Sequence, residues 1–307
     1  MKQELRIIYM GTPEFAVPSL QKLVAAGWNV VAVITAPDKP KGRGQKLIPS
    51  PVKEAALDLN IPVLQPTNLK SPEFLDELSS YQANLQIVVA FRMLPEVVWN
   101  MPALGTFNLH ASLLPNYRGA APINWAIING ETETGMTTFF LKHEIDTGNI
   151  ILQEKEPIHP EDTIGSLYER MMEKGSDLVV KTVELIANGT VTTYPQDENK
   201  FLHHAPKIFK ETCQIDWNKD ATSIHNLVRG LSPYPAAWTT LQEKTCKIYL
   251  TETSAKNDPN LQVGEWTSDG KTYLKFQTGN GSIYIKELQL EGKKRMGIEE
   301  FLRGFKL

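Results

Sequence analysis

The chain has 307 residues, enough for about two domains, and its 41% hydrophobic and 22% charged residues are typical of a globular protein. Cys213 and Cys246 form no CxxC pair, and the N-terminus lacks a signal-type or membrane-spanning apolar run, so we expect a cytoplasmic protein with no disulfide framework, zinc site or membrane partner. The net charge is −3, yet residues 206–307 hold 15 basic and 12 acidic side chains, a balance compatible with a polyanionic partner or with an ordinary surface.

The first part of the chain alternates strand and helix patterns. Apolar runs predict strands at 5–10, 29–35, 85–90 and 106–110, and the first three are too uniformly apolar to have a face in water. Helical patterns lie between them at 13–26, 51–59 and 72–79, the last with Ser71 as N-cap and Pro72 at the first helical position. This order predicts an α/β domain with a doubly wound, mostly parallel sheet.

The remainder of the chain changes character after a long helix. Strand patterns at 135–143 and 148–157 flank a tight turn, and an amphipathic helix is expected at 163–187. Residues 190–205 are polar and unpatterned, which is typical of a linker. Short strand patterns follow at 246–251, 272–277 and 282–288 and indicate a small β-barrel. We therefore expect domains at 1–189 and 206–307, joined by residues 190–205.

Common nucleotide and hydrolase motifs are missing from the sequence. The turn after the first strand has one glycine where a dinucleotide fingerprint needs GxGxxG, and neither GxxxxGK[ST] nor GxSxG occurs. These absences argue against a nicotinamide-dependent dehydrogenase, a nucleotide hydrolase and a serine hydrolase. No group of residues has the spacing of metal ligands, so no metal is expected.

Polar residues stand at the end of the fourth strand, where open α/β sheets place their ligands. Asn108 and His110 share one face because side chains alternate along a strand. They either face a ligand or satisfy loop carbonyls. Asp146, in the turn at 143–148, supplies a carboxylate that either completes a catalytic set or only forms the turn.

The stretch NLHASLLPNYRGAAPINWAI, followed by HEIDTG, resembles the folate-dependent formyltransferases. The resemblance implies a Rossmann-like catalytic domain that uses 10-formyltetrahydrofolate. It also implies that Asn108, His110 and Asp146 are catalytic, with Asn108 and His110 as donors to the developing oxyanion. Asp146 would charge and orient the imidazole or accept a proton through water. The residues that would contact tetrahydrofolate are Phe91, Arg92, Leu94, Ser112, Leu113, Leu114 and Pro115.

Further features point to the branch of this family that acts on methionyl-initiator tRNA. The basic, glycine-rich stretch 36–46 resembles a loop that contacts the acceptor stem, and 225–238 resembles the start of an OB-like C-terminal barrel that binds tRNA. The resemblance implies RNA contacts, with no role for DNA, through Lys39, Lys41, Arg43, Lys46, Lys293, Lys294 and Arg295. Either basic group is otherwise a solvated surface. A nucleotide-sugar N-formyltransferase and a non-catalytic RNA-binding protein remain as alternatives.

Overall fold

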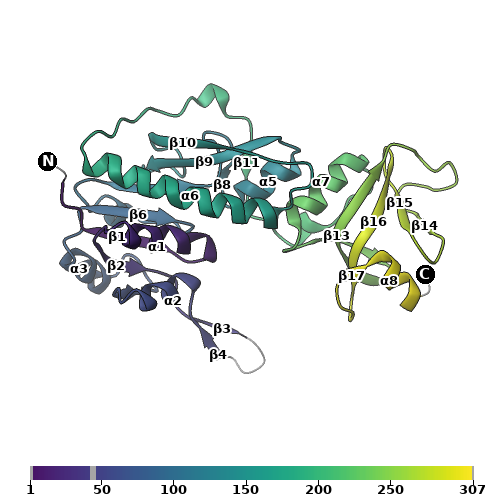
Figure 1. The fold of residues 1–307 in the computed structure, drawn as a ribbon, viewed down its shortest axis with the longest axis horizontal. Coiled ribbons are helices and arrows are strands. Elements are labelled where there is room, and N and C mark those ends of the chain that lie inside the picture. Colours follow the sequence, from purple (N-terminus) through teal and green to yellow (C-terminus); the bar gives the residue numbers. More distant parts are fainter. Residues whose placement is uncertain (1–2, 42–45, 306–307) are drawn as a thin grey trace. The chain divides into compact units, whose positions relative to one another are not determined.

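The computed structural model describes residues 3–41 and 46–305 of the chain, drawn as a ribbon in Figure 1. These residues form two compact units. The first comprises the chain up to Arg118 together with Gly135–Glu156 and Tyr168–His203. The second comprises Gly119–Thr134, Pro157–Leu167 and the chain from His204 onward. Among the helices of the described part, none has the length and apolar character needed to cross a membrane.

The first unit is built on a seven-stranded sheet with the strand order β10-β9-β7-β6-β1-β2-β5. β1 pairs in parallel with β2 and β6, β6 pairs in parallel with β7, and β9 runs antiparallel to β7. All residues of β1 and β6 are buried, as their uniformly apolar sequences predicted. The expected doubly wound fold is therefore confirmed. Its strands are β1 (Ile7–Gly11), β2 (Val30–Ile34), β5 (Val63–Leu64), β6 (Leu85–Val89), β7 (Thr106–His110), β9 (Glu133–Phe140) and β10 (Ile150–Pro157).

Helices cover this sheet and begin where the sequence provides caps. Ser71 Oγ accepts a hydrogen bond from the backbone N–H of Phe74 at 3.3 Å, as expected of an N-cap. The helix expected from residue 13 is instead a short 3-10 turn followed by α1, because Pro18 lacks an N–H and fits only in a first turn. The helices are η1 (Glu14–Ala16), α1 (Val17–Ala25), α2 (Pro51–Asp58), α3 (Pro72–Ser80), α4 (Glu96–Trp99) and α6 (Ile164–Ala187).

The longest helix, α6, lies against one face of the sheet (Figure 1). A Cβ added to Gly175 would lie 3.0 Å from the side chain of Leu109 on β7, so glycine allows the close approach. Thr138 on β9 and Thr182 on α6 share a buried hydrogen bond of 2.9 Å. Leu109 therefore faces α6, and the residues on either side of it, Asn108 and His110, face the other side of the sheet.

The second unit contains the predicted small C-terminal β-structure, with the strand order β12-β13-β16-β15-β14 and β17 paired with β16. Each of the neighbouring strands in this sheet pairs antiparallel. The helix α7 was not expected from the sequence. Asp220 caps it by accepting a hydrogen bond from the N–H of Ser223 at 2.9 Å. The elements are α5 (Pro122–Ile128), α7 (Ala221–Leu231), β12 (Ala237–Leu241), β13 (Lys244–Ser254), β14 (Trp266–Ser268), β15 (Leu274–Gln277), β16 (Ser282–Leu290), β17 (Met296–Gly297) and α8 (Ile298–Gly304).

Several short elements complete the chain. They are β3 (Lys39–Lys41), β4 (Lys46–Ile48), β8 (Arg118–Gly119), η2 (Glu198–Lys200), β11 (His204–Ala205) and η3 (Glu211–Cys213).

A buried carboxylate ties β10 to α6. The side chain of Glu156 is 1% exposed and accepts hydrogen bonds from Arg170 and Lys174. Burial alone would raise the pKa of Glu156, but these two hydrogen bonds outweigh it and hold the pKa below its ordinary 4.5. Since the folded-state pKa is the lower one, the stabilisation is present above pH 4.5 and is lost as the pH falls below that value.

We expect Glu156→Gln to lower the free energy of unfolding by about 2 to 3 kcal/mol, because both cations lose their buried partner. Glu154→Gln, on the same strand, is the matched control. Glu154 is 35% exposed and 3.4 Å from Lys181, so its loss should cost at most about 1 kcal/mol. Denaturant unfolding at neutral and acidic pH measures both. Equal effects of the two variants, or a Glu156→Gln deficit that does not shrink in acid, would contradict this account.

Candidate active site

His110 ends β7 and is almost fully buried, with 6% of its surface exposed. Its Nε2 lies 2.8 Å from the carbonyl oxygen of Tyr117. A carbonyl oxygen can only accept a hydrogen bond, so Nε2 must carry a hydrogen and donate it. This leaves Nδ1 as the ring nitrogen that is able to gain or lose a proton.

Asp146 meets that second nitrogen. Its Oδ2 lies 3.9 Å from Nδ1 of His110, and the two side chains are 14% and 7% exposed. A carboxylate at this place faces the one ring nitrogen that the Tyr117 carbonyl leaves available. The structure thus brings together two of the three residues predicted to be catalytic, which lie far apart in the sequence.

The turn that carries Asp146 requires an unusual backbone. Asp146 has φ of 56°, in the left-handed region that aspartate tolerates better than most residues. Two residues later, a Cβ on Gly148 would lie 1.6 Å from the carbonyl oxygen of Phe140, so only glycine fits. Asp146 therefore lies in a turn, as one interpretation expected, while its carboxylate also faces His110.

Asn108 lies two residues before His110 on β7 and is half-buried. In the antiparallel pairing with β9, Asn108 stands opposite Phe139 and His110 stands opposite Thr137. Asn108 and His110 therefore point to the same side, away from α6, as the alternation of the strand predicted. The arrangement suits two donors that approach one substrate group, and the catalytic role of Asn108 stays a prediction.

The loop after His110 is fastened by residues that the sequence did not single out. Thr137 Oγ1 donates to the carbonyl oxygen of Ser112 at 2.7 Å and accepts from the N–H of Leu114 at 3.2 Å. Gln153 Nε2 donates to the carbonyl oxygen of Leu114 at 2.9 Å, and the Leu114–Pro115 peptide is cis. Thr137 became recognisable only when the strand register placed it opposite His110. These bonds hold the loop predicted to contact tetrahydrofolate; its remaining member, Leu113, is half-buried.

The second segment predicted to contact folate follows β6. β6 and β7 are parallel neighbours, so residues 91–95 and the loop after His110 leave the same edge of the sheet. Leu94 is buried in the core, and the Arg92 guanidinium donates to the carbonyl oxygens of Pro66 and Thr67. Phe91 is partly buried beside Arg92. The backbone contacts of this segment with tetrahydrofolate, which the resemblance implied, stay a prediction.

The basic stretch 36–46, expected as a loop, begins and ends as the two arms of a β-hairpin. β3 and β4 pair antiparallel, with Lys39 opposite Ile48. Lys39 is exposed on this hairpin. Arg43 lies outside the described residues, and so do the side chains of Lys41 and Lys46.

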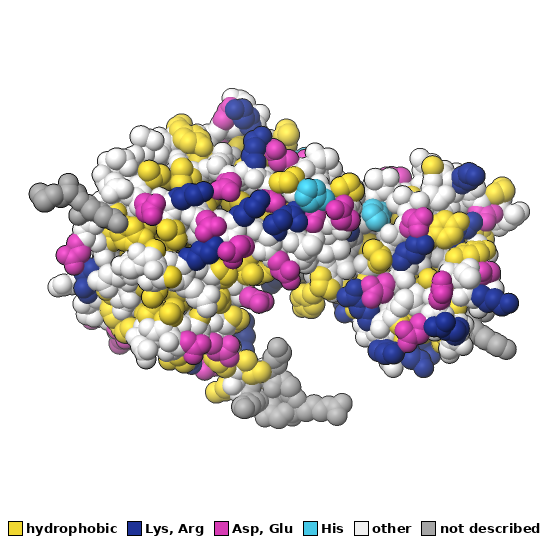
Figure 2. Space-filling model, in the orientation of Figure 1, with side chains coloured by type: hydrophobic (Ala, Val, Ile, Leu, Met, Phe, Trp, Pro, Cys, Tyr) yellow, Lys and Arg dark blue, Asp and Glu magenta, His cyan; other side chains and the backbone are white. Residues whose placement is uncertain are grey.

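The basic cluster of the C-terminal unit is largely engaged in ion pairs. Arg295 donates two hydrogen bonds to Glu287 and lies over the ring of Tyr249 at 4.2 Å, while Lys294 lies 3.0 Å from Glu300. Lys293 is exposed. On the face shown in Figure 2, lysines and arginines are interspersed with acidic side chains over each unit. Two of the three consecutive basic residues at 293–295 are therefore already paired with carboxylates.

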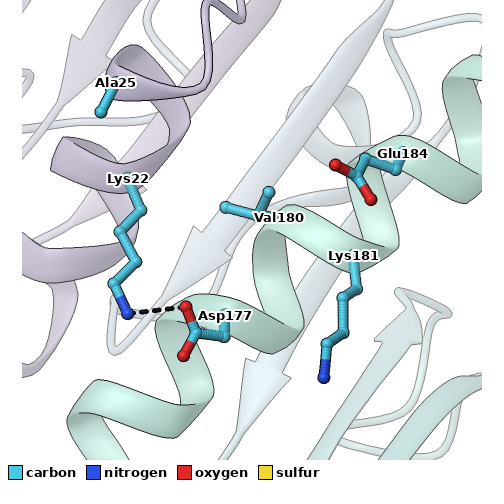
Figure 3. A pocket seen from close by; sticks show the side chains of 6 residues that line it. All are labelled: Lys22, Ala25, Asp177, Val180, Lys181 and Glu184. Carbon is cyan, nitrogen blue, oxygen red and sulfur yellow. Dashed lines mark hydrogen bonds and ion pairs between the residues drawn. The ribbon is translucent and has the colours of Figure 1, made fainter.

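A surface hollow of about 440 Å³ lies elsewhere in the first unit, between α1 and α6 (Figure 3). Lys22 bridges it by donating to Asp177 and to Glu173. None of the predicted site residues lines this hollow. It is an open groove between two helices. In the described part of the chain, no group of three or more His, Cys, Asp or Glu residues is arranged to hold a metal ion.

Comparison with known proteins places this geometry in context. Residues 5–183 match the family described as Formyl transferase, and residues 207–306 match Formyl transferase, C-terminal domain. The methionyl-tRNA formyltransferase of Bacteroides fragilis is 55% identical over 314 aligned positions, covering 100% of this chain and 97% of that protein. That of Flavobacterium johnsoniae is 54% identical, covering 98% and 96%.

Solved structures share the fold at lower identity. The sugar 3N-formyl transferase WlaRD superposes with a TM-score of 0.69 at 22% identity, covering 95% of this chain and 100% of that chain. HypX from Aquifex aeolicus, solved with tetrahydrofolic acid, superposes with a TM-score of 0.65 at 18% identity, covering 98% of this chain and 47% of that chain.

We expect Thr137→Val to release the loop at 111–117. The valine keeps the volume of threonine but removes the acceptor of the Leu114 N–H and the donor to Ser112, at a cost of about 1 to 3 kcal/mol. Amide hydrogen exchange of this loop should therefore accelerate. Thr138→Val is the matched control, because its hydroxyl bonds to Thr182 on α6. If both variants change the loop equally, Thr137 has no particular hold on it.

Proposed function

The chain belongs to the formyl transferase family, and on that premise we propose that it transfers the formyl group of 10-formyltetrahydrofolate to the α-amine of methionyl-initiator tRNA. The proposal is carried by the His110–Asp146 pair at the end of β7, in a chain that shares more than half of its residues with methionyl-tRNA formyltransferases along its whole length. The sugar formyltransferase structures are more distant, and their likeness supports only the shared fold.

The residues at the end of β7 match the demands of formyl transfer. 10-formyltetrahydrofolate supplies the formyl group, and the methionine amine attacks its carbonyl carbon. Negative charge then develops on the formyl oxygen. The amide N–H of Asn108 and the Nδ1–H of protonated His110 are donors for that oxygen, and one donor of this kind contributes roughly 3 to 4 kcal/mol.

Proton transfer assigns the remaining role to Asp146. The attacking amine loses one proton while the departing N10 of the folate gains one. Because Nε2 of His110 is bound to the Tyr117 carbonyl, Nδ1 and the Asp146 carboxylate are the groups of this pair that can exchange that proton. Asp146 orients the imidazole and accepts the amine proton directly or through water, which contributes about 10²- to 10⁴-fold in such reactions.

The two segments at the carboxyl edge of β6 and β7 fit a folate. Residues 112–115 form a loop in which the carbonyl oxygens of Ser112 and Leu114 accept hydrogen bonds from Thr137 and Gln153. Phe91 follows the neighbouring strand β6, and its ring is partly exposed. We propose that Phe91, Arg92, Leu94 and residues 112–115 line the folate site, mostly through backbone groups. The protein would act in the cytoplasm, where its RNA substrate is made.

RNA contact is proposed for the β3–β4 hairpin and for the basic turn of the C-terminal unit. Lys39 on the hairpin and Lys293 on the turn are exposed, and the proposal extends to Lys41, Arg43 and Lys46. Lys294 and Arg295 belong to the same proposal with less weight, because Glu300 and Glu287 already neutralise them.

The direct test mixes the protein with 10-formyltetrahydrofolate and methionine-charged initiator tRNA and follows formylmethionine. A nucleotide-linked amino sugar serves as the competing acceptor. Formylation of the sugar without formylation of the tRNA would overturn the proposed function.

We expect His110→Ala and Asn108→Ala to lower kcat and kcat/KM together, by about 10²- to 10³-fold, because each removes a donor used in the transition state. Folate affinity, measured by calorimetry, should change little. Asp146→Ala should be at least as damaging. Asn100→Ala, at an exposed asparagine that ends α4, is the control. Activity within about threefold of wild type for His110→Ala and Asn108→Ala would remove them from the mechanism.

Salt dependence of tRNA affinity reports the RNA contacts. Each lost phosphate contact should flatten the slope of log affinity against log salt by about 0.7 to 0.9. We expect Lys39→Gln and Lys293→Gln to show this change, and Arg295→Gln to show less because Glu287 already pairs with it. Lys70→Gln, at an exposed residue before α3, is the control. Slopes identical to wild type in the first two variants would exclude both surfaces.

A further inference from the structure

A strap formed by residues 196–203 packs against the active site, although its sequence indicated only a linker. Asn116 Oδ1 accepts from the N–H of Leu202 at 2.7 Å, and the N–H of Tyr117 donates to the carbonyl oxygen of His203 at 2.7 Å. The His203 ring stacks on Tyr117, with 5.5 Å between centroids. The strap therefore holds Tyr117, whose carbonyl accepts the hydrogen bond from His110.

The same strap holds the turn of Asp146 through one side chain. Gln196 is 9% exposed, and its Nε2 donates to the carbonyl oxygens of Asp146 at 2.7 Å and Gly148 at 3.0 Å. Its Oε1 accepts hydrogen bonds from Nε of Arg118 at 3.1 Å and from Nη2 of the same arginine at 2.6 Å. The hydrogen-bonding capacity of the amide, two donors and two acceptor sites, is fully used.

Arg118 is itself held by two further residues of the strap. Its terminal nitrogens donate to Glu198 at 3.1 and 2.6 Å, and its guanidinium lies over the Phe201 ring at 5.3 Å. These contacts lower the pKa of Glu198, because the hydrogen bond from Arg118 favours its charged form. The orientation of the Gln196 amide is thereby imposed, since Arg118 can only donate and must meet the amide oxygen.

We propose that Gln196, oriented by Arg118, is a positioning residue that keeps the Asp146 carboxylate beside Nδ1 of His110. The inference rests on the proposed function. Hydrogen bonds to the carbonyl oxygens of Asp146 and Gly148, on either side of Thr147, fix the turn that carries the carboxylate. A misplacement of about 1 Å in a catalytic group can cost about 10²-fold in rate.

Gln196→Glu is the sharpest variant. It keeps the size of the side chain and its bonds to Arg118, but it places an oxygen against two carbonyl oxygens and so loses both donors to the turn. We expect kcat to fall about 10- to 100-fold while KM for folate and for charged tRNA stays within about threefold. Asn199→Ala is the control: Asn199 is an exposed strap residue whose side chain donates to Asp197, and its loss should leave kcat unchanged.

A double-mutant cycle separates positioning from general support of the fold. If Gln196 acts through Asp146, then Gln196→Glu should have no further effect on kcat in an Asp146→Asn background. Multiplication of the two effects, or a kcat within about twofold of wild type for Gln196→Glu, would overturn the inference. Should Gln196→Glu fail to fold, Arg118→Lys serves in its place: it keeps the charge beside Glu198 but loses the fork that orients the amide, and the same cycle applies.

Failure of the proposed function is distinguishable from failure of this inference. A wild-type protein that does not formylate charged tRNA would refute the function. The same cycle would then be measured on hydrolysis of 10-formyltetrahydrofolate, with water as the acceptor of the formyl group. Loss of the Gln196 effect in the Asp146→Asn background would still support positioning, and multiplication of the effects would still reject it.

Discussion

The hydrogen bond from Nε2 of His110 to the carbonyl oxygen of Tyr117 determines the chemistry that this site can perform. It commits one ring nitrogen to the protein and leaves the other for a proton, 3.9 Å from the carboxylate of Asp146. The bond depends on Tyr117 adopting a left-handed backbone, with φ of 60°. Residues other than glycine rarely adopt this backbone conformation unless the surrounding structure stabilises it. The loop after β7 is therefore as much a part of the site as the histidine.

Polar side chains stabilise this loop and the turn of Asp146. Loops beyond the ends of strands lack the hydrogen bonds between strands, so their backbone groups need other partners. Thr137 and Gln153 bind the carbonyls and N–H of the loop after His110, and Gln196 binds the carbonyls of the Asp146 turn. Each comes from a strand or segment distant in the sequence. A buried polar group left without a partner costs about 1 to 3 kcal/mol, so breaking these bonds is costly and they keep both loops in one arrangement.

In the C-terminal unit, tertiary contacts also determine which basic side chains are paired with carboxylates. The sequence KKR at 293–295 reads as a basic cluster, yet Glu287 and Glu300 lie beside its last two members. A phosphate that approaches Arg295 must compete with a carboxylate already bound by two hydrogen bonds. The RNA contact proposed for this surface would therefore depend on the charge left after ion pairing, so exposed Lys293 should contribute more to it than Arg295.

The sequence by itself determined the elements whose signals are local. Uniformly apolar strands such as β1 and β6 predicted a sheet buried on both faces, Ser71 and Pro72 predicted the start of α3, and the alternation of β7 placed Asn108 and His110 on one face. The resemblance to a known family identified Asp146 as a candidate catalytic residue. Only the tertiary structure decided that the Asp146 carboxylate faces Nδ1, that Nε2 donates to the Tyr117 carbonyl, and that Gln196 binds the turn of Asp146. Two of these three contacts are made to backbone carbonyls, which the sequence does not distinguish, and two of them join segments that are far apart in the chain.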